Sequence, residues 1–151
     1  SAGVFLRTEQ SALSTGWCVG FYDGTVRCGL NPRISGANAG KAAFQAYDDV
    51  AAFTESATAN WTGLYAYNRS AANAKQLYKE GSSVGTGTRA SSAPPDMSVK
   101  LLGTSQLNWY TDAMGCFAWV GGSLTAEQHA SLASIVTTNW ITPMGLTPPA
   151  K

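Results

Sequence analysis

The chain has 151 residues, which is ample for one domain and short for two. Charged residues make up 13% of it, against roughly 25% in an average domain. The net charge is +1 with no basic run, which argues against nucleic acid as a partner. No apolar run approaches the roughly 18 residues of a membrane span, so we expect no membrane insertion.

The first clear element is a hairpin over residues 17–30, WCVGFYDGTVRCGL, with Asp23-Gly24 at its centre. A two-residue turn there pairs Val19 with Cys28 and places the apolar residues of both strands on one face. A three-residue loop would instead set Cys18 opposite Cys28 and permit a disulfide. Because burial of the apolar face sets the register, the two-residue turn is favoured and free thiols are expected.

Two more hairpins follow. Residues 42–53 can fold at Asp48-Asp49 and place Phe44 beside Phe53, although a helix is the alternative for this stretch. Residues 75–86 can fold at Glu80-Gly81, which sets Leu77 opposite Val84.

Two single strands complete the middle of the chain. Residues 61–68 alternate two sets of side chains on opposite faces, and residues 98–102 form another short strand. The two sets are Trp61, Tyr65 and Tyr67 on one face, and Leu64 and Ala66 on the other.

Residues 116–120, CFAWV, are apolar on both faces: Phe117 and Trp119 on one, the other three on the opposite face. A strand of this kind must be covered from both sides. We expect one cover to be a facing sheet and the other to be a helix that follows directly.

That helix is predicted over residues 125–141. Thr125 is a good N-cap, and Gln128 three residues later completes a capping-box pattern. Pro143 ends the helix. Four apolar residues recur at helical spacing and predict one buried stripe: Leu132, Ile135, Val136 and Trp140.

Many short strands with one terminal helix predict an all-β fold, a two-sheet antiparallel sandwich with the helix packed on a sheet. We expect a single domain over residues 1–145, including that helix, and a flexible tail over residues 146–151. Cys116 is the third cysteine, so not all three can be paired within one chain.

The search for chemistry finds no catalytic, metal or cofactor site. His129 is the single histidine and is expected to be a surface or packing residue. No cysteine or histidine spacing fits zinc, and no nucleophile elbow or phosphate loop is present. None of the nine acidic residues alternates with another on a predicted strand, as a glycosidase pair would. Asp48-Asp49 could bind calcium, but a solvated turn is the favoured interpretation.

A binding site is suggested by LNWYTD, residues 107–112, in a predicted loop. There Trp109 and Tyr110 could stack on a sugar ring while Asn108 and Asp112 hydrogen-bond its hydroxyls. The alternative is that the two aromatic side chains pack under the sandwich or at a subunit contact.

Two stretches, YNRSAANAKQLYKEG (67–81) and FAWVGGSLTAEQHASL (117–132), carry a family resemblance. The chain resembles the concanavalin A-like, laminin-G-like domains of structural proteins from tailed bacteriophages and of prophage-derived bacterial proteins. Its LYKEG hairpin is similar to the L-Y-K-N-G hairpin of that family, and the similarity spans residues 3–145. One departure is that fuller members carry extra strands before the point where this chain begins.

The resemblance implies a two-sheet jelly roll without catalytic carboxylates, displayed on the virion surface as a tail fibre or spike, a baseplate part or a head decoration. It implies other virion proteins as partners, a symmetric homo-oligomer, and in one version a host surface glycan. Such a protein is made in the reducing cytoplasm of a bacterial host, which agrees with free thiols at Cys18 and Cys28.

Overall fold

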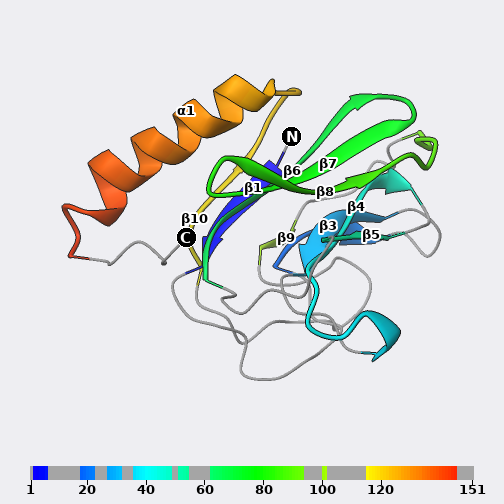
Figure 1. Cartoon of the computed structure of the whole chain (residues 1–151), viewed down its shortest axis with the longest axis horizontal. Helices are drawn as coiled ribbons and strands as arrows, with labels where there is room; N and C mark the ends of the chain where they lie inside the picture. The colour runs from blue at the N-terminus through cyan, green and yellow to red at the C-terminus, as the bar shows by residue number, and fades with distance from the viewer. Residues whose placement is uncertain are drawn as a thin grey trace.

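The computed structural model describes residues 2–6, 18–22, 27–31, 36–48, 51–54, 62–93, 100–101 and 115–145. In these ranges the chain forms two five-stranded antiparallel sheets and a C-terminal helix (Figure 1). The first sheet has the order β10 (Gly115–Val120), β1 (Ala2–Leu6), β6 (Gly63–Ala71), β7 (Ala74–Lys79) and β8 (Ser82–Gly87). The second has the order β5 (Ala52–Phe53), β4 (Ala43–Asp48), β3 (Arg27–Asn31), β2 (Val19–Tyr22) and β9 (Lys100–Leu101), and a 3-10 turn (Gly36–Asn38) precedes β4.

The two sheets pack face to face around one apolar core. Val4 and Tyr65 of the first sheet lie in the same cluster as Val19, Leu30 and Phe44 of the second, and all five are buried. Alternation along each strand points these side chains inward. The predicted arrangement of two antiparallel sheets with a terminal helix is therefore confirmed.

Helix α1 (Ala126–Val136) covers the other face of the first sheet (Figure 1). Phe5 of β1 and Leu64 of β6 point to this side and share a second cluster with Ala133 and Val136. Strands β1 and β6 are thus buried on both faces, between the facing sheet and the helix. The described chain is a three-layer structure, with the first sheet in the middle.

The prediction that β10 is covered on both sides is confirmed for two of its residues. Ala118 packs against the core between the sheets, and Trp119 packs against the cluster under the helix. The Trp119 ring lies over Gly3, its partner on β1, so closely that a Cβ atom at Gly3 would collide with the ring. The side chains of Cys116 and Phe117 lie outside the described part, so their burial stays a prediction.

The start of α1 is confirmed in detail. Thr125 is the N-cap, its hydroxyl accepts from the backbone N–H of Gln128, and the Gln128 side chain accepts from the Thr125 N–H at 2.8 Å. Before it, the Asn68 amide on β6 donates to the carbonyl of Leu124 at 2.7 Å. This bond fixes the chain to the sheet directly after the glycine pair at 121–122, and the helix starts from that point.

The predicted buried stripe of the helix is wrong at two of its four positions. Ile135 and Trp140 are each 53% exposed, whereas Val136 and Ile141 are buried. The helix changes to a π turn over Thr137–Ile141, which adds one residue to the turn. Because of this extra residue, Ile141 and not Trp140 continues the buried face after Val136.

The hairpin over residues 17–30 forms, but its register differs from both expected ones. Val19 pairs with Leu30 and Phe21 with Cys28, so residues 23–26 connect the strands. Compared with the two-residue turn, the register is shifted by two, which keeps Val19, Cys28 and Leu30 on the core face as predicted. Cys18 and Cys28 are both buried thiols and form no disulfide, as expected.

The reason for this register is a close approach of two glycines. Gly20 lies opposite Gly29 and has φ +146°, and a Cβ atom at Gly20 would overlap the carbonyl oxygen of Cys28. Only glycine can occupy position 20 in this conformation without strain.

The hairpin over residues 42–53 also forms, with Phe44 opposite Ala52 instead of Phe53. The expected turn at Asp48-Asp49 does not start at Asp48, because β4 runs on through that residue and pairs it with Arg27 of β3.

The third hairpin has the predicted turn. Glu80 and Gly81 have φ values of 49° and 78°, as a type I′ turn requires, and Lys79 pairs with Ser82. One residue of β8 bulges after Ser83, which sets Leu77 opposite Gly85 and not opposite Val84.

Candidate functional site

The four predicted binding residues, Asn108, Trp109, Tyr110 and Asp112, lie outside the described residues. The structure instead brings together a cluster of charged side chains at one end of the sandwich. Its members come from both sheets: Asp48 from β4, Arg69 from β6 and Lys75 from β7.

Asp48 lies at the centre of this cluster. Its side chain has no exposed area, and its Oδ2 atom lies 2.5 Å from Arg69 Nη2 and 2.7 Å from Lys75 Nζ. The Lys75 side chain is 1% exposed and that of Arg69 10%. The expectation of a solvated turn at Asp48 is therefore wrong, because the carboxylate is buried as the shared partner of two cations.

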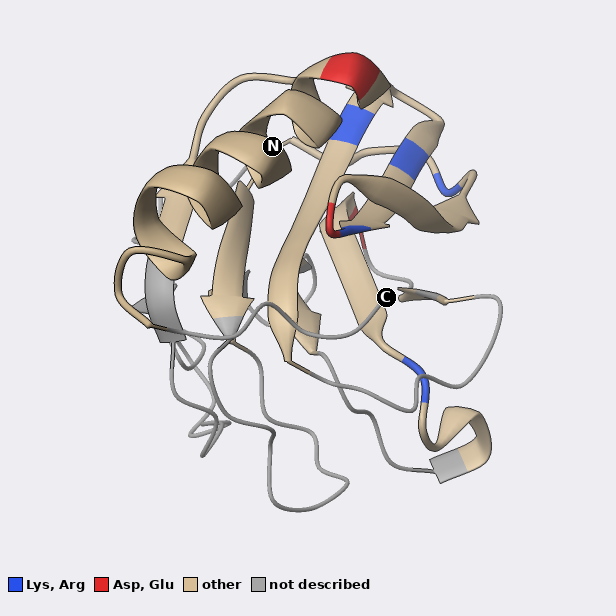
Figure 2. Ribbon diagram, turned by 60° about the vertical axis from the view of Figure 1, so that its left-hand side comes forward, with Lys and Arg blue, Asp and Glu red and all other residues tan. Residues whose placement is uncertain are grey.

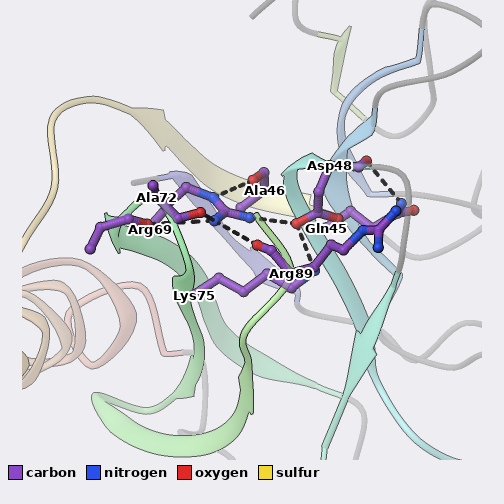
Figure 3. A network of polar contacts seen from close by, with 8 residues as sticks. Gln45, Ala46, Asp48, Arg69, Ala72, Lys75 and Arg89 are labelled. Atoms are coloured by element: carbon purple, nitrogen blue, oxygen red, sulfur yellow. Dashed lines mark hydrogen bonds and ion pairs between the residues drawn. The ribbon is translucent and has the colours of Figure 1, made fainter. Parts of the chain in front are cut away.

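Arg69 connects separate parts of the chain through its guanidinium (Figure 3). Its Nε donates to the carbonyl of Ala46 at 2.6 Å, and its Nη1 donates to the carbonyls of Ala72 and Arg89 at 2.5 and 3.0 Å. The side chain thus holds together β4, the β6–β7 turn and the segment that follows β8. A planar guanidinium with five donors suits this task, and a lysine would not.

The backbone next to Asp48 is strained. Tyr47 has φ 58°, a left-handed conformation that costs a non-glycine residue about 1–2 kcal/mol. It lies where the backbone pairing of β3 with β4 shifts, so that Arg27 is the register partner of Asp48 and Cys28 that of Ala46. Such strain persists only where the surrounding contacts enforce it, and here they include the ion pairs of Asp48.

Sequence reasoning missed this cluster, although a signal was present. Strand periodicity places Arg69 on the same face as Tyr65 and Tyr67, and Lys75 on the same face as Leu77. A cation on the core face of a strand needs a buried acid. Asp48 was assigned to a turn, so it was not considered as that acid.

Two cations of the cluster share one carboxylate, that of Asp48. Carbonyl oxygens accept the other bonds of Arg69. The Lys75 ammonium also lies 5.7 Å from the centre of the Phe44 ring, within the range of a cation–π contact. The positive charge of the two cations is therefore partly spread over carbonyl dipoles and a ring face.

A cavity of about 480 Å³ opens beside Lys75, where the edge strands β5 and β8 of the two sheets meet. It opens to solvent, since Thr88, Arg89 and Ala90 in its wall are exposed. Gly87 permits the approach of the two sheets, because a Cβ atom there would press on Lys75 Cε and on the Ala52 methyl group. The wall is formed by Ala51, Ala52, Lys75, Gly87, Thr88, Arg89 and Ala90.

A second buried polar group lies in the same core. The Cys28 thiol and the Tyr67 hydroxyl are 3.1 Å apart. Burial raises the pKa of Cys28, and the hydrogen bond to Tyr67 offsets part of the rise. Burial also raises the pKa of Tyr67 well above its usual value. Both groups are neutral at pH 7, so this thiol is a poor nucleophile.

His129 lies on the buried side of α1 and packs against the first sheet, which is one of the two roles expected for it. It is 2% exposed and stacks on Tyr78 with ring centres 4.0 Å apart. Its Nε2 atom is buried without a hydrogen-bond partner in the described structure, and burial lowers its pKa.

The remaining described acids have local partners, and no metal site emerges from them. The Glu80 carboxylate accepts from the backbone N–H of Leu64 at 2.6 Å, and Glu127 lies in the first turn of α1. Within the described ranges, no three histidine, cysteine or acidic side chains gather closely enough to bind a metal ion. The one α-helix there falls short of the length and hydropathy needed to cross a bilayer.

The chain matches no family model, no curated protein and no solved structure.

Proposed function

We propose that this protein is a non-enzymatic structural module of a bacteriophage particle, a tail fibre or spike, baseplate or head decoration protein that acts by display and protein–protein contact. The family resemblance of residues 67–81 and 117–132 supplies the viral setting. On this proposal the two sheets and the helix belong to a jelly roll of the concanavalin A-like type.

The observation that carries the contact role is the outer surface of the C-terminal helical segment. Three large apolar side chains, Ile135, Trp140 and Met144, are each 53% exposed there. The segment from residue 128 to residue 145 contains no Asp, Glu, Lys or Arg. In Figure 2 the helix is coloured as charged only at its start. We call this surface the helix outer face; it is rich in Trp and Met and poor in charge, as the centre of a protein interface is.

A second copy of this chain is the partner that such a surface fits best. A face without charges does not repel an identical face, and a two-fold axis would bring the Trp140 side chains of two copies together. The ion cluster and the docked helix keep the scaffold rigid, so little conformational entropy is lost on association. Assembly of copies is also the usual form of a virion module.

The experiment is sedimentation velocity of the purified protein over a range of concentrations. We expect the wild type to self-associate and Trp140→Glu to sediment as a monomer. Ser134→Glu adds the same charge at another exposed helix position, roughly 100° around the helix from Ile135, and should leave association unchanged. A wild type that stays monomeric and does not co-sediment with phage particles from its host strain would rule out the proposal.

The alternative proposal is a carbohydrate-binding module that recognises a glycan on the host surface. It rests on the aromatic pair Trp109 and Tyr110 beside Asn108 and Asp112, a combination that can stack on a sugar and hydrogen-bond its hydroxyls. A glycan array with the wild type and Trp109→Ala tests it. Binding that is lost in the variant supports this function, and an array without hits leaves only the contact role.

A further inference from the structure

We propose that His129 makes the docking of α1 on the first sheet depend on pH, so that acidification releases the helix while the two sheets stay packed together. This device does not rest on the function proposed above, and it concerns the inner side of the helix, not the helix outer face. His129 is the single histidine of the chain, and histidine is the side chain that ordinarily changes its charge between about pH 5 and pH 8.

The imidazole of His129 is buried without the hydrogen bond that a buried polar group normally has. The residue is 2% exposed, and its Nε2 atom has no hydrogen-bond partner in the described structure. A missing hydrogen bond is costly for a neutral ring and more costly for a charged one, because the charge is also removed from water. Protonation therefore disfavours the docked position of this side chain.

The described sheet residues that contact the start of α1 are neutral. Tyr78 of β7 stacks on the imidazole with ring centres 4.0 Å apart, and its hydroxyl donates to Gln76 Oε1 at 2.7 Å. Asn68 of β6 donates its amide to the carbonyl of Leu124, directly before the helix. Strands β1, β8 and β10 and the π turn contain no charged residue. These elements offer dipoles to an imidazolium and no opposite charge.

Two acids lie on elements near the start of the helix. Glu127 is exposed in the first turn of α1, where its own backbone N–H and then the N-cap hydroxyl lower its pKa. Glu80 lies in the β7–β8 turn, and its carboxylate accepts from the backbone N–H of Leu64 at 2.6 Å. Neither acid reverses the effect of burial on His129, whose pKa is lowered by burial first and by the positive charge of the amino terminus second.

His129 is a large part of the contact that holds the helix. It is one of the three buried residues of α1, with Ala133 and Val136, and the three share one face. The two sheets are held together by a larger apolar cluster and by the ion pairs of Asp48. Because elements with a small buried contact can open before the whole fold does, loss of the His129 contact should free the helix first.

The test is thiol labelling of Val136→Cys in the Cys116→Ser background. Val136 is 2% exposed on the inner side of α1, so the new thiol is protected while the helix is docked. The reagent is an aromatic disulfide that reacts with thiols at acid as well as neutral pH, and each rate is divided by that of the same protein unfolded in urea at the same pH. We expect the new thiol to react at least about fivefold faster at about pH 5.5 than at about pH 7.5, the effect of one buried polar group left unsatisfied.

Cys18 and Cys28 report on the core between the sheets in the same molecules, because both are buried there. Mass spectrometry of the labelled peptides should find them protected at both pH values. His129→Phe keeps an aromatic ring on Tyr78 but cannot be protonated, and His129→Gln is a second neutral variant. With either one, circular dichroism should show a folded protein and the new thiol should react equally at both pH values. The matched control is Glu127→Gln, which removes the acid of the first helical turn and should keep the pH dependence.

Three results would overturn the inference. The first is an equal rate for the new thiol at both pH values, and the second is an unchanged pH dependence in the two His129 variants. The third is labelling of Cys18 and Cys28 as fast as that of the new thiol, which would show that the whole fold opens and not the helix alone.

Discussion

Replacing Asp48 by Asn tests the energetics of the buried ion cluster. The change keeps the shape of the side chain but leaves Arg69 and Lys75 without their shared carboxylate, at positions with 10% and 1% side-chain exposure. Removing one partner of a buried charge group costs about 3–5 kcal/mol. The free energy of unfolding of a domain is about 5–15 kcal/mol, so the loss is a large part of the total.

The assay is urea denaturation followed by tryptophan fluorescence. We expect a lower midpoint with an unchanged m-value, because the surface exposed on unfolding stays the same. In a thermal melt, the same loss lowers the midpoint by roughly 6–20 °C for a domain of this size.

Lys75→Met serves as the internal comparison. It leaves Asp48 paired with Arg69 and keeps the apolar stem of the lysine in place. The loss should be smaller than that of Asp48→Asn, about 1–2 kcal/mol. The reasoning would be refuted if Asp48→Asn cost under about 1 kcal/mol, or if Lys75→Met were the more damaging change.

Three further predictions follow from the helix and the thiols. Ile141→Ala should lower the free energy of unfolding by about 2–5 kcal/mol and Trp140→Ala by under about 1 kcal/mol, because the π turn buries only Ile141. Chemical denaturation of both variants checks this prediction, and the reverse order of the two losses would contradict the π-turn register. Since burial lowers the pKa of His129, the imidazole takes up a proton at a higher pH in the unfolded state than in the folded one, so stability should fall as the pH drops below about 6.5. In thermal melts from pH 8 to pH 5, His129→Phe should lose this part of the dependence of the melting temperature on pH. An identical pH dependence in the variant would refute the prediction. In a Cys116→Ser background, Cys18 and Cys28 should react with a maleimide only after unfolding, and rapid labelling of the native protein would contradict their burial.

The sequence predicts the elements of this fold better than their registers. Alternation correctly places Tyr65 and Tyr67 toward one layer and Leu64 toward the other, and the capping residues fix the start of the helix. The exact pairing depends on features that act over long distances. Gly20 can approach Gly29 only after β3 is in place, and the extra residue of the π turn is decided by packing under the helix.

The charged cluster illustrates a second limit. Arg69 and Lys75 could be recognised as inward-facing cations from strand periodicity alone. Their partner could not, because Asp48 lies next to another acid in a stretch with the composition of a turn. Its burial results from β4 continuing through Tyr47 in a left-handed conformation, which no local pattern indicates.

The most direct test of the central claim is cross-linking through the helix outer face. Ile135→Cys in the Cys116→Ser background places one accessible thiol on this face, because Cys18 and Cys28 are buried. Ser82→Cys, at an exposed position on β8, is the matched control. With a short bismaleimide, the account predicts a covalent dimer from Ile135→Cys and little from the control. Equal, low yields from both variants would contradict it.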